Sequence, residues 1–513
     1  MRKGRGKASN LRFEDVTVID IAEEGKGVGK TEDFVLFIEK AVPGDVVDVE
    51  VYRKKKNFGE AKIIALKQPS PHRTQPFCEH FGTCGGCKWQ HMTYESQLQF
   101  KQKAVTDALS RLAKIDVSHT LPIVASPADR YYRNKLEYTF SNKRWLYDGE
   151  NRTDETLEMS ALGFHIPGRF DKILDINHCY LQADPSNDIR LKIRDYVRLH
   201  NMSFYDVREH TGALRNLIIR TSSTGELMVI VVFAHATEEE VNSLMGYVEQ
   251  EFPKITSLLY ILNQKMNDTI FDQEVVAWKG PEYIHEHMDE IQFRIGPKSF
   301  YQTNAIQAKR LYEIARDFAG FTGTELVYDL YTGAGTIANF VAKHVKEVIG
   351  VEYVPSAIED AKVNSAINNI NNTKFYAGDM KDVLNAEFVA QHGKPNVIIT
   401  DPPRAGMHAD VVERLMEIEA SKIVYVSCNA ATQARDLIVL KDKYNVTQIQ
   451  PVDMFPHTQH VENVVLLELK SNEEIASIQE EKARIAEEKE RAKREEESAK
   501  SIEESTSSEV QGA

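Results

Sequence analysis

The chain has 513 residues, 42% of them hydrophobic, which is enough for several cores and indicates two to four domains. The net charge of −14 argues mildly against a nucleic-acid partner, although basic runs at Arg2–Lys7 and Arg53–Lys56 allow local patches. No apolar run of about eighteen residues and no signal peptide is visible, and the five cysteines do not suggest a disulfide scaffold, so we expect a cytoplasmic protein that does not enter a membrane.

Residues 10–68 alternate short apolar runs with turn residues. The runs Phe34–Glu39 and Val46–Arg53 are typical of strands, and Pro43 and Gly44 between them mark a turn. This pattern predicts a small all-β barrel, which a proline-rich linker follows.

Residues 69–290 mix the two kinds of periodicity. Thr93–Leu112 has helical spacing, whereas Lys135–Phe140 and Asn216–Phe233 have the composition of strands, with a hairpin turn at Thr224. We therefore expect a central α+β domain built on an antiparallel sheet.

Four of the five cysteines belong to this central region. Cys78, Cys84 and Cys87 form a C-x5-C-x2-C pattern, and Cys179 follows later. Four thiolates suit either zinc or an iron–sulfur cluster, although the spacing differs from the paired CxxC motifs of a zinc ribbon. Four unrelated core cysteines are the alternative, which the clustering of three within ten residues makes less attractive.

Residues 291–470 alternate strands and helices, which predicts a doubly wound, mainly parallel α/β sheet with ligands at the carboxyl ends of its strands. Gly333 and Gly335 form a turn between a strand and a helix, without the third glycine of GxGxxG or the GK[ST] of a phosphate loop. Glu352 ends the second strand, where an acid can accept hydrogen bonds from ribose hydroxyls, and Asp379 after the third can meet an adenine amino group. Together these features resemble the cofactor site of S-adenosylmethionine-dependent methyltransferases; a nicotinamide site, a nucleotide site or a plain turn is the alternative.

Cys428 ends a later apolar strand and precedes a predicted helix, whose N-terminus is expected to lower the thiol pKa. It is either a small core residue or a nucleophile. If the acceptor is carbon 5 of uracil, a thiolate must first add to carbon 6, and a base must later remove the proton from carbon 5. Glu462, before the last strand, is the candidate base, with a surface acid or an ion-pair partner as the alternative. Asp401 and Arg404 follow the fourth strand, where they can orient the cofactor or substrate.

Three motifs, DPPRAGMH, SCNAATQARDL and HVENVVLLEL, resemble in order and spacing the signatures of the RNA uracil-5-methyltransferase family. The resemblance implies Cys428 as nucleophile and Glu462 as base. It also implies cofactor contacts from Gln302, Tyr331, Glu352 and Asp401. Many members have asparagine where Thr336 stands, and often phenylalanine at Tyr331.

The front barrel resembles a TRAM domain, a small RNA-binding barrel, and the cysteine pattern occurs in cluster-bearing members of the family. The resemblance thus implies a [4Fe-4S] cluster on the four cysteines, in a structural or RNA-facing role because thiolates would fill all four positions. It also implies 23S rRNA as substrate, with tRNA as the alternative. Arg133, Lys135 and Arg215 are our candidates for RNA contacts, with ordinary strand-edge charges as the alternative. No protein partner is inferred, and we expect a monomer.

The tail, residues 471–513, carries thirteen Glu and seven Lys or Arg and is expected to be a charged helix or disordered. Two other functions compete with uridine methylation. One is a non-catalytic RNA-binding assembly factor, which has no need of both Cys428 and Glu462. The other is methylation of a base nitrogen or a ribose oxygen, neither of which needs a cysteine nucleophile.

Overall fold

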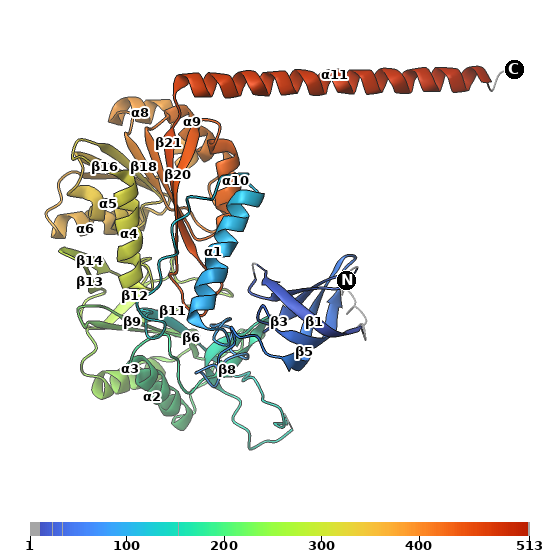
Figure 1. The fold of residues 1–513 in the computed structure, drawn as a ribbon. Coiled ribbons are helices and arrows are strands. Elements are labelled where there is room, and N and C mark those ends of the chain that lie inside the picture. The colour runs from blue at the N-terminus through green and yellow to red at the C-terminus, as the bar shows by residue number, and fades with distance from the viewer. Residues whose placement is uncertain (1–10, 23, 33, 152, 511–513) are drawn as a thin grey trace.

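The computed structural model describes residues 11–510 except 23, 33 and 152, with side chains as far as residue 494, so the basic run Arg2–Lys7 lies outside the described residues. Three parts follow one another along the chain: a barrel, a central domain and a second α/β sheet (Figure 1). Among the helices in this part of the chain, none is long and apolar enough to cross a membrane.

The first five strands close into a barrel in the order β1-β2-β3-β5-β4. They are β1 (Arg12–Ile21), β2 (Gly27–Lys30), β3 (Val35–Glu39), β4 (Val46–Lys54) and β5 (Phe58–Gln68). Alternate apolar side chains, such as Val16 and Ile38, fill the interior. Gly29 must be small, because a Cβ there would lie 2.6 Å from the Val16 side chain. The predicted barrel is confirmed.

The central domain is built on a seven-stranded sheet of order β12-β11-β10-β9-β6-β7-β8, antiparallel except for the pair β10 and β11. Its strands are β6 (Lys135–Ser141), β7 (Ala161–Ile166), β8 (Arg169–Asp175), β9 (Leu214–Thr221), β10 (Leu227–Phe233), β11 (Ser257–Leu262) and β12 (Val275–Lys279). Two helices, α2 (Ser186–Leu199) and α3 (Glu238–Glu251), join its apolar core. The hairpin between β9 and β10 turns where Thr224 predicted it, with Gly225 at φ 83°.

The second large sheet has the order β17-β16-β15-β18-β19-β21-β20. Its strands are β15 (Leu326–Leu330), β16 (Glu347–Glu352), β17 (Thr373–Ala377), β18 (Val397–Thr400), β19 (Lys422–Ser427), β20 (Tyr444–Val452) and β21 (Glu462–Leu469). The helices between them are α4 (Ala305–Ala319), α5 (Thr336–Ala342), α6 (Pro355–Ile367), α7 (Met380–Val383), α8 (Ala386–His392), α9 (Ala409–Ile418) and α10 (Ala430–Leu440). The first five strands in this order are parallel, and β21 runs antiparallel to both of its neighbours. The predicted doubly wound, mainly parallel sheet is confirmed.

Helix α1 (Tyr94–Arg111) precedes the central sheet in sequence but packs against α10 of the second sheet. Val105 and Leu109 of α1 belong to the apolar core of that sheet. Figure 1 shows α1 between the barrel and the rest of the molecule. A two-stranded ribbon, β13 (Ile284–Met288) with β14 (Ile291–Ile295), packs on α6. Helix α1, which precedes the central sheet in sequence, therefore belongs physically to the second sheet.

The tail forms one long helix, α11 (Asn472–Val510), which projects from the second sheet (Figure 1). Its first turns are attached to that sheet by an ion pair between Lys482 and Asp442. A helix with so few large apolar residues has nothing to bury, which explains why it extends away from the body.

Candidate active site

The glycine turn lies between β15 and α5 at the carboxyl edge of the second sheet. Gly335 has φ 73°, and a Cβ there would lie 2.9 Å from that of Ala361, so only glycine fits. Gly333 has φ 55° and nothing within 4 Å of its missing Cβ. The backbone at Gly333 is therefore open to a ligand, as a close-contact cofactor site requires. Thr336 opens α5, and its hydroxyl lies 3.2 Å from that of Tyr312.

Three of the predicted cofactor residues lie near this turn: Tyr331, Glu352 and Asp379, whose carboxylate acts on the Tyr331 hydroxyl together with that of Glu352. Tyr331 follows β15 with φ 63°, and Glu352 ends β16, where its carboxylate accepts from Gly333 N at 3.2 Å. Asp379 caps α7, accepting from the Lys381 backbone N–H. Gln302 precedes α4, and Asn134 donates to its carbonyl. The strand order reverses between β15 and β18; Tyr331 directly follows β15 and Asp401 directly follows β18, where a ligand site is expected.

A carboxylate that the sequence reading did not single out lies beneath the turn. Asp329 is 1% exposed; one of its oxygens accepts from Thr332 Oγ1 and Ala338 N, and the other has no hydrogen-bond partner among the described residues. Burial raises the pKa of Asp329 to about 7. Burial, with the Asp329 carboxylate nearby, also raises the pKa of Asp401. An acid inside the apolar strand run LVYDL was the signal in the sequence.

The register of β19 and β21 brings Cys428 and Glu462 together. Ser427, the last residue of β19, pairs with Asn463, the second residue of β21, so the residue after Ser427 and the residue before Asn463 lie at the same edge of the sheet. Those residues are Cys428 and Glu462. Glu462 is buried and Cys428 is partly buried. A thiol and a carboxylate from segments far apart in sequence thus meet at one sheet edge.

The electrostatics of this edge correct one prediction. Helix α10 follows Cys428, but burial, with Glu462 and Asp401 adding to it, raises the pKa of Cys428 to about 11. The Asn429 side chain already accepts from the backbone N–H groups of Ala431 and Thr432 at the helix start. The helix therefore has few free donors to offer the thiol, and the expected lowering is wrong for this ligand-free state. Burial likewise raises the pKa of Glu462 to about 8, with Asp401 contributing.

Cys428 opens into a cleft of about 640 Å³ between the barrel, α1 and the second sheet. Arg404 and His460 also line this cleft, and Arg404 donates to the His460 ring at 3.0 Å. Burial and Arg404 lower the pKa of His460 to about 4, so the ring is neutral and can accept that hydrogen bond. The cleft has the size of a ligand site and reaches the thiol from the side of the barrel.

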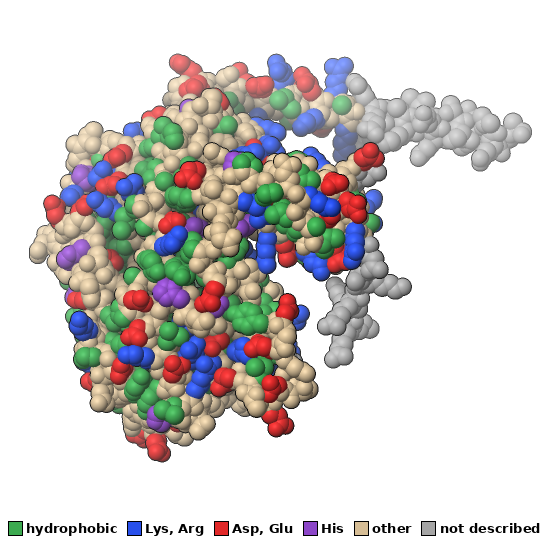
Figure 2. Space-filling view, turned by 60° about the horizontal axis from the view of Figure 1, so that its bottom comes forward, with side chains coloured by type: hydrophobic (Ala, Val, Ile, Leu, Met, Phe, Trp, Pro, Cys, Tyr) green, Lys and Arg blue, Asp and Glu red, His purple; other side chains and the backbone are tan. Residues whose placement is uncertain are grey.

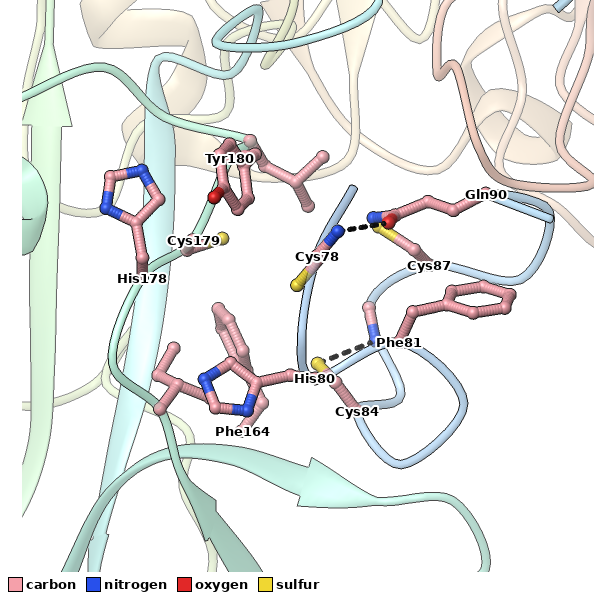
Figure 3. Close-up of a pocket in the computed structure, with 13 residues that line it drawn as sticks. Cys78, His80, Phe81, Cys84, Cys87, Gln90, Phe164, His178, Cys179 and Tyr180 are labelled. Atoms are coloured by element: carbon pink, nitrogen blue, oxygen red, sulfur yellow. Dashed lines mark hydrogen bonds between the residues drawn. The ribbon is translucent and has the colours of Figure 1, made fainter. Parts of the chain in front are cut away.

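The four other cysteines line a single pocket. Cys78, Cys84 and Cys87 come from one loop and Cys179 from the segment before α2, and Figure 3 shows them around a common space. Burial raises the pKa of all four thiols, to about 12 for Cys84 and Cys87. Thiols so enclosed stay protonated unless a cation is bound among them.

Each of these sulfurs also faces an N–H group that partly offsets the rise in pKa. The Gly86 backbone donates to Cys84 Sγ at 3.4 Å, and the Leu181 backbone faces Cys179. Such N–H donors suit thiolates that bind a metal centre. Among the described residues, however, no group of three or more His, Cys, Asp or Glu is placed to hold a single metal ion.

Of the three candidate RNA contacts, the prediction for Arg215 is wrong. It is 1% exposed, donates to Asp268 at 2.8 Å and to the Asn263 carbonyl, and so holds a loop of the central domain. Arg133 lies over the ring of Phe455, and Lys135 is half-buried. Acidic and basic side chains are interspersed on the face that Figure 2 shows. Charge alone therefore marks no RNA path on that face.

Comparisons with known proteins agree with this geometry. Residues 218–470 match the tRNA (uracil-5-)-methyltransferase family, and residues 12–64 match the TRAM domain. An RNA methyltransferase of Bacteroides thetaiotaomicron, itself described as uncharacterized, is 58% identical over 454 residues, which are 88% of this chain and 100% of that protein. A relative from Porphyromonas gingivalis with the same description is 55% identical over 88% of this chain and 98% of its own length.

Among solved structures, a Pyrococcus abyssi tRNA (uracil-54, C5)-methyltransferase in complex with S-adenosyl-L-homocysteine is 28% identical, with a TM-score of 0.69. The alignment covers 89% of this chain and 100% of that one. The second sheet is thus the fold of S-adenosylmethionine-dependent methyltransferases, and the barrel is a TRAM domain. The chain is an RNA methyltransferase that belongs to the tRNA (uracil-5-)-methyltransferase family.

Proposed function

We propose that this protein methylates carbon 5 of a specific uridine in 23S rRNA, with Cys428 as nucleophile and Glu462 as general base. The observation that carries the proposal is the pairing of β19 with β21, which sets the thiol beside a buried carboxylate at the end of a cleft. Methylation of a base nitrogen or a ribose oxygen needs no such pair, and neither does an RNA-binding assembly factor.

Cys428 acts first in this mechanism. Its thiolate adds to carbon 6 of a uracil that has left its stack, a C–S bond forms, and the electron pair of the C5=C6 bond becomes available at carbon 5. S-adenosylmethionine supplies the methyl group as an electrophile when it is bound. Arg404 at the mouth of the cleft lowers the pKa of Cys428 against the effect of burial, and so favours the thiolate.

Glu462 acts second. Its carboxylate removes the proton from carbon 5, the C5=C6 bond forms again, and the bond between carbon 6 and the Cys428 sulfur breaks to release the thiolate. The raised pKa of Glu462 suits a carboxylate that must accept a proton near neutral pH. The Glu462 side chain is buried, so the transfer of the proton from carbon 5 to its carboxylate occurs out of contact with bulk water.

The residues of the carboxyl edge would hold the cofactor. The open space over Gly333 and the unpartnered oxygen of Asp329 fit a ligand with a polar, positively charged end. We assign the cofactor contacts to Gln302, Tyr331, Glu352, Asp379 and Asp401. A cation beside Asp401 would also relieve the crowding of negative charge around Asp401 and Glu462.

We further propose that Cys78, Cys84, Cys87 and Cys179 hold a [4Fe-4S] cluster. Four enclosed thiols, each facing an N–H group, suit an iron–sulfur cluster, and the resemblance to cluster-bearing members of the family favours it over zinc. The cluster would fasten the cysteine loop to the central domain, and no catalytic step passes through it. The TRAM domain together with this pocket supports 23S rRNA. The P. abyssi structure, named for uridine 54 of tRNA, makes tRNA the second candidate.

The decisive test uses RNA that contains 5-fluorouridine. Fluorine on carbon 5 cannot be removed as a proton, so a covalent complex with Cys428 accumulates and is visible by denaturing gel and mass spectrometry. 23S rRNA fragments and tRNA transcripts are compared in parallel. An adduct mapped to Cys428 supports the mechanism and identifies the RNA, whereas methylation of ordinary RNA without any adduct on the fluorinated one would reject it.

A further inference from the structure

Glu462, the proposed general base, is the first residue after the loop that connects β20 to β21. Residues 453–461 connect β20 to β21, and Val452 pairs with Glu462, so the loop begins and ends beside the base. His460, which accepts from Arg404, lies on the same loop. Whatever holds this loop therefore determines where the Glu462 carboxylate lies.

Helix α1 holds the loop with one polar face. Tyr94, Gln97 and Lys101 are spaced by three and four residues, which aligns them on one side of the helix. The Tyr94 hydroxyl donates to Asp453 at 2.9 Å. Lys101 bonds to Asp453 at 2.5 Å and to the Phe455 carbonyl at 3.0 Å. Gln97 and Lys101 are 0% exposed, so their polar groups bind protein atoms and not water.

Gln97 is hydrogen-bonded both to this loop and to the segment that follows the cysteine loop in sequence. Its Oε1 accepts from the His457 backbone N–H at 2.8 Å. Its Nε2 donates to the carbonyls of Met92 at 2.9 Å and Trp89 at 3.1 Å, and lies 3.1 Å from His457 Nδ1. One buried amide thus binds both segments.

His457 also connects these two segments. Its carbonyl accepts from the backbone N–H groups of Lys88, at 2.8 Å, and Trp89, at 3.0 Å. Lys88 directly follows Cys87 of the cysteine pocket. His457 has φ 63°, a conformation that residues other than glycine adopt only when their surroundings impose it. The cysteine loop and α1 therefore meet on a single strained residue, five positions before Glu462.

We propose that Gln97 and His457 are positioning residues that set Glu462 for proton removal and connect the four-cysteine pocket to the catalytic base. The inference rests on the proposed function, since it takes Glu462 as the base. A buried amide is costly unless its hydrogen bonds are made, and in return it fixes one geometry where an apolar side chain would accept several. When these hydrogen bonds are lost, the step that slows is removal of the proton from carbon 5, because that step needs the Glu462 carboxylate in place.

The test separates that step from the others. Gln97→Met keeps the size of the side chain and removes all of its hydrogen bonds. With S-adenosylmethionine and substrate RNA, we expect formation of the covalent complex within about threefold of the wild-type rate. Release of methylated RNA should slow by about tenfold or more, so that the complex accumulates on ordinary uridine. The matched control is Asn263→Leu, which removes an equally buried amide that donates to the carbonyls of Asn267 and Thr269 in the central domain.

Each outcome decides something. The control should lower the melting temperature without separating the two rates. Release from Gln97→Met at the wild-type rate, or an equal loss of both steps, overturns the inference. If Gln97→Met does not fold, His457→Asn replaces it: asparagine tolerates positive φ and keeps the backbone contacts, but the change removes the ring nitrogen that lies 3.1 Å from Gln97 Nε2, so a smaller effect is expected. That variant should show the same separation at about threefold, and its absence again overturns the inference. A wild-type protein that forms neither adduct nor methylated RNA counts against the proposed function instead.

Discussion

The five cysteines of this chain occupy two kinds of surroundings. Cys428 is partly buried at the end of β19, opens into a large cleft, and has the carboxylates of Glu462 and Asp401 as its electrostatic neighbours. The other four face one another in an enclosed pocket where N–H groups approach their sulfurs. Burial raises the thiol pKa in both places, so burial alone does not distinguish a nucleophile from a ligand. Access for a substrate and the chemistry of the neighbours do.

The largest expected effect separates the two sites outright. Cys428→Ala removes the proposed nucleophile and should reduce methyl transfer by about 10⁴-fold or more. The melting temperature and the binding of S-adenosyl-L-homocysteine should stay close to wild type, because Cys428 lines a cleft and fills no core. Transfer of labelled methyl groups to RNA measures the first, and thermal unfolding and calorimetry the others. Retention of a tenth of the activity would mean that Cys428 is not the nucleophile.

Glu462→Gln tests the neighbour rather than the thiol. The amide cannot accept a proton, so the adduct should form and its release should slow by about 100-fold or more. A denaturing gel of protein with ordinary uridine RNA would show a persistent covalent band. Prompt release of 5-methyluridine by this variant would show that another group removes the proton.

The pH dependence of the rate follows from the same carboxylate. Because burial, with Asp401, raises the pKa of Glu462 to about 8, the base is mostly protonated at pH 6. Release of 5-methyluridine RNA from the covalent complex, followed under single-turnover conditions, should therefore rise up to about tenfold per pH unit between pH 6 and 8, and less steeply above. A profile that is flat across this range would mean that bound cofactor and RNA have already shifted the pKa of Glu462 below 6.

Cys84→Ser examines the enclosed pocket. We expect protein purified without oxygen to lose most of its iron and sulfide, and the free energy of unfolding to fall by at least about 3 kcal/mol, since a group bound only to the folded state stabilises it. Alkylation of Cys428 should proceed at the wild-type rate. One zinc per chain and no iron in the wild-type protein would replace the cluster by the alternative metal.

These two regions also differ in how far the sequence predicts them. Cys428 follows one apolar strand run and Glu462 begins another, so local pattern predicts that both lie at the edge of a doubly wound sheet where ligands bind. Their roles as nucleophile and base were implied by the family resemblance and remain predictions. Arg215 follows the same kind of strand pattern, but its partner Asp268 is 53 residues away, and only the folded chain shows that the charge is buried and paired. The contacts of α1 with Asp453 span more than 350 residues, and helical spacing alone does not reveal them.

The thiol pKa of Cys428 was beyond sequence reasoning for a related reason. A helix start next to a cysteine is visible in the sequence, but the Asn429 cap and the carboxylates of Glu462 and Asp401 come from the fold. Burial, with the two carboxylates adding to it, raises the pKa of Cys428, which is opposite in sign to the effect expected from the helix. A local electrostatic feature predicts a pKa only when no stronger neighbour arrives from a distant segment.

The smallest expected effect concerns stability, and its sign is the reverse of the usual cost of a mutation in an active site. The folded pKa of Glu462 is about 8, above the value of a free carboxyl group, so between about pH 4.5 and 8 the folded state binds more protons than the unfolded one. The free energy of unfolding therefore falls as the pH rises through this window. Glu462→Gln removes that loss, so the variant should match wild type near pH 4.5 and exceed it by on the order of 1–4 kcal/mol at pH 8.5.

Urea titrations of the ligand-free proteins at the two pH values measure the difference. Cys84→Ser should show no such gain at high pH, because the stability that this variant loses is that of the proposed cluster. An equal stability of Glu462→Gln and wild type at pH 8.5 would mean that the Glu462 carboxylate is better solvated or paired than its burial beside Asp401 implies.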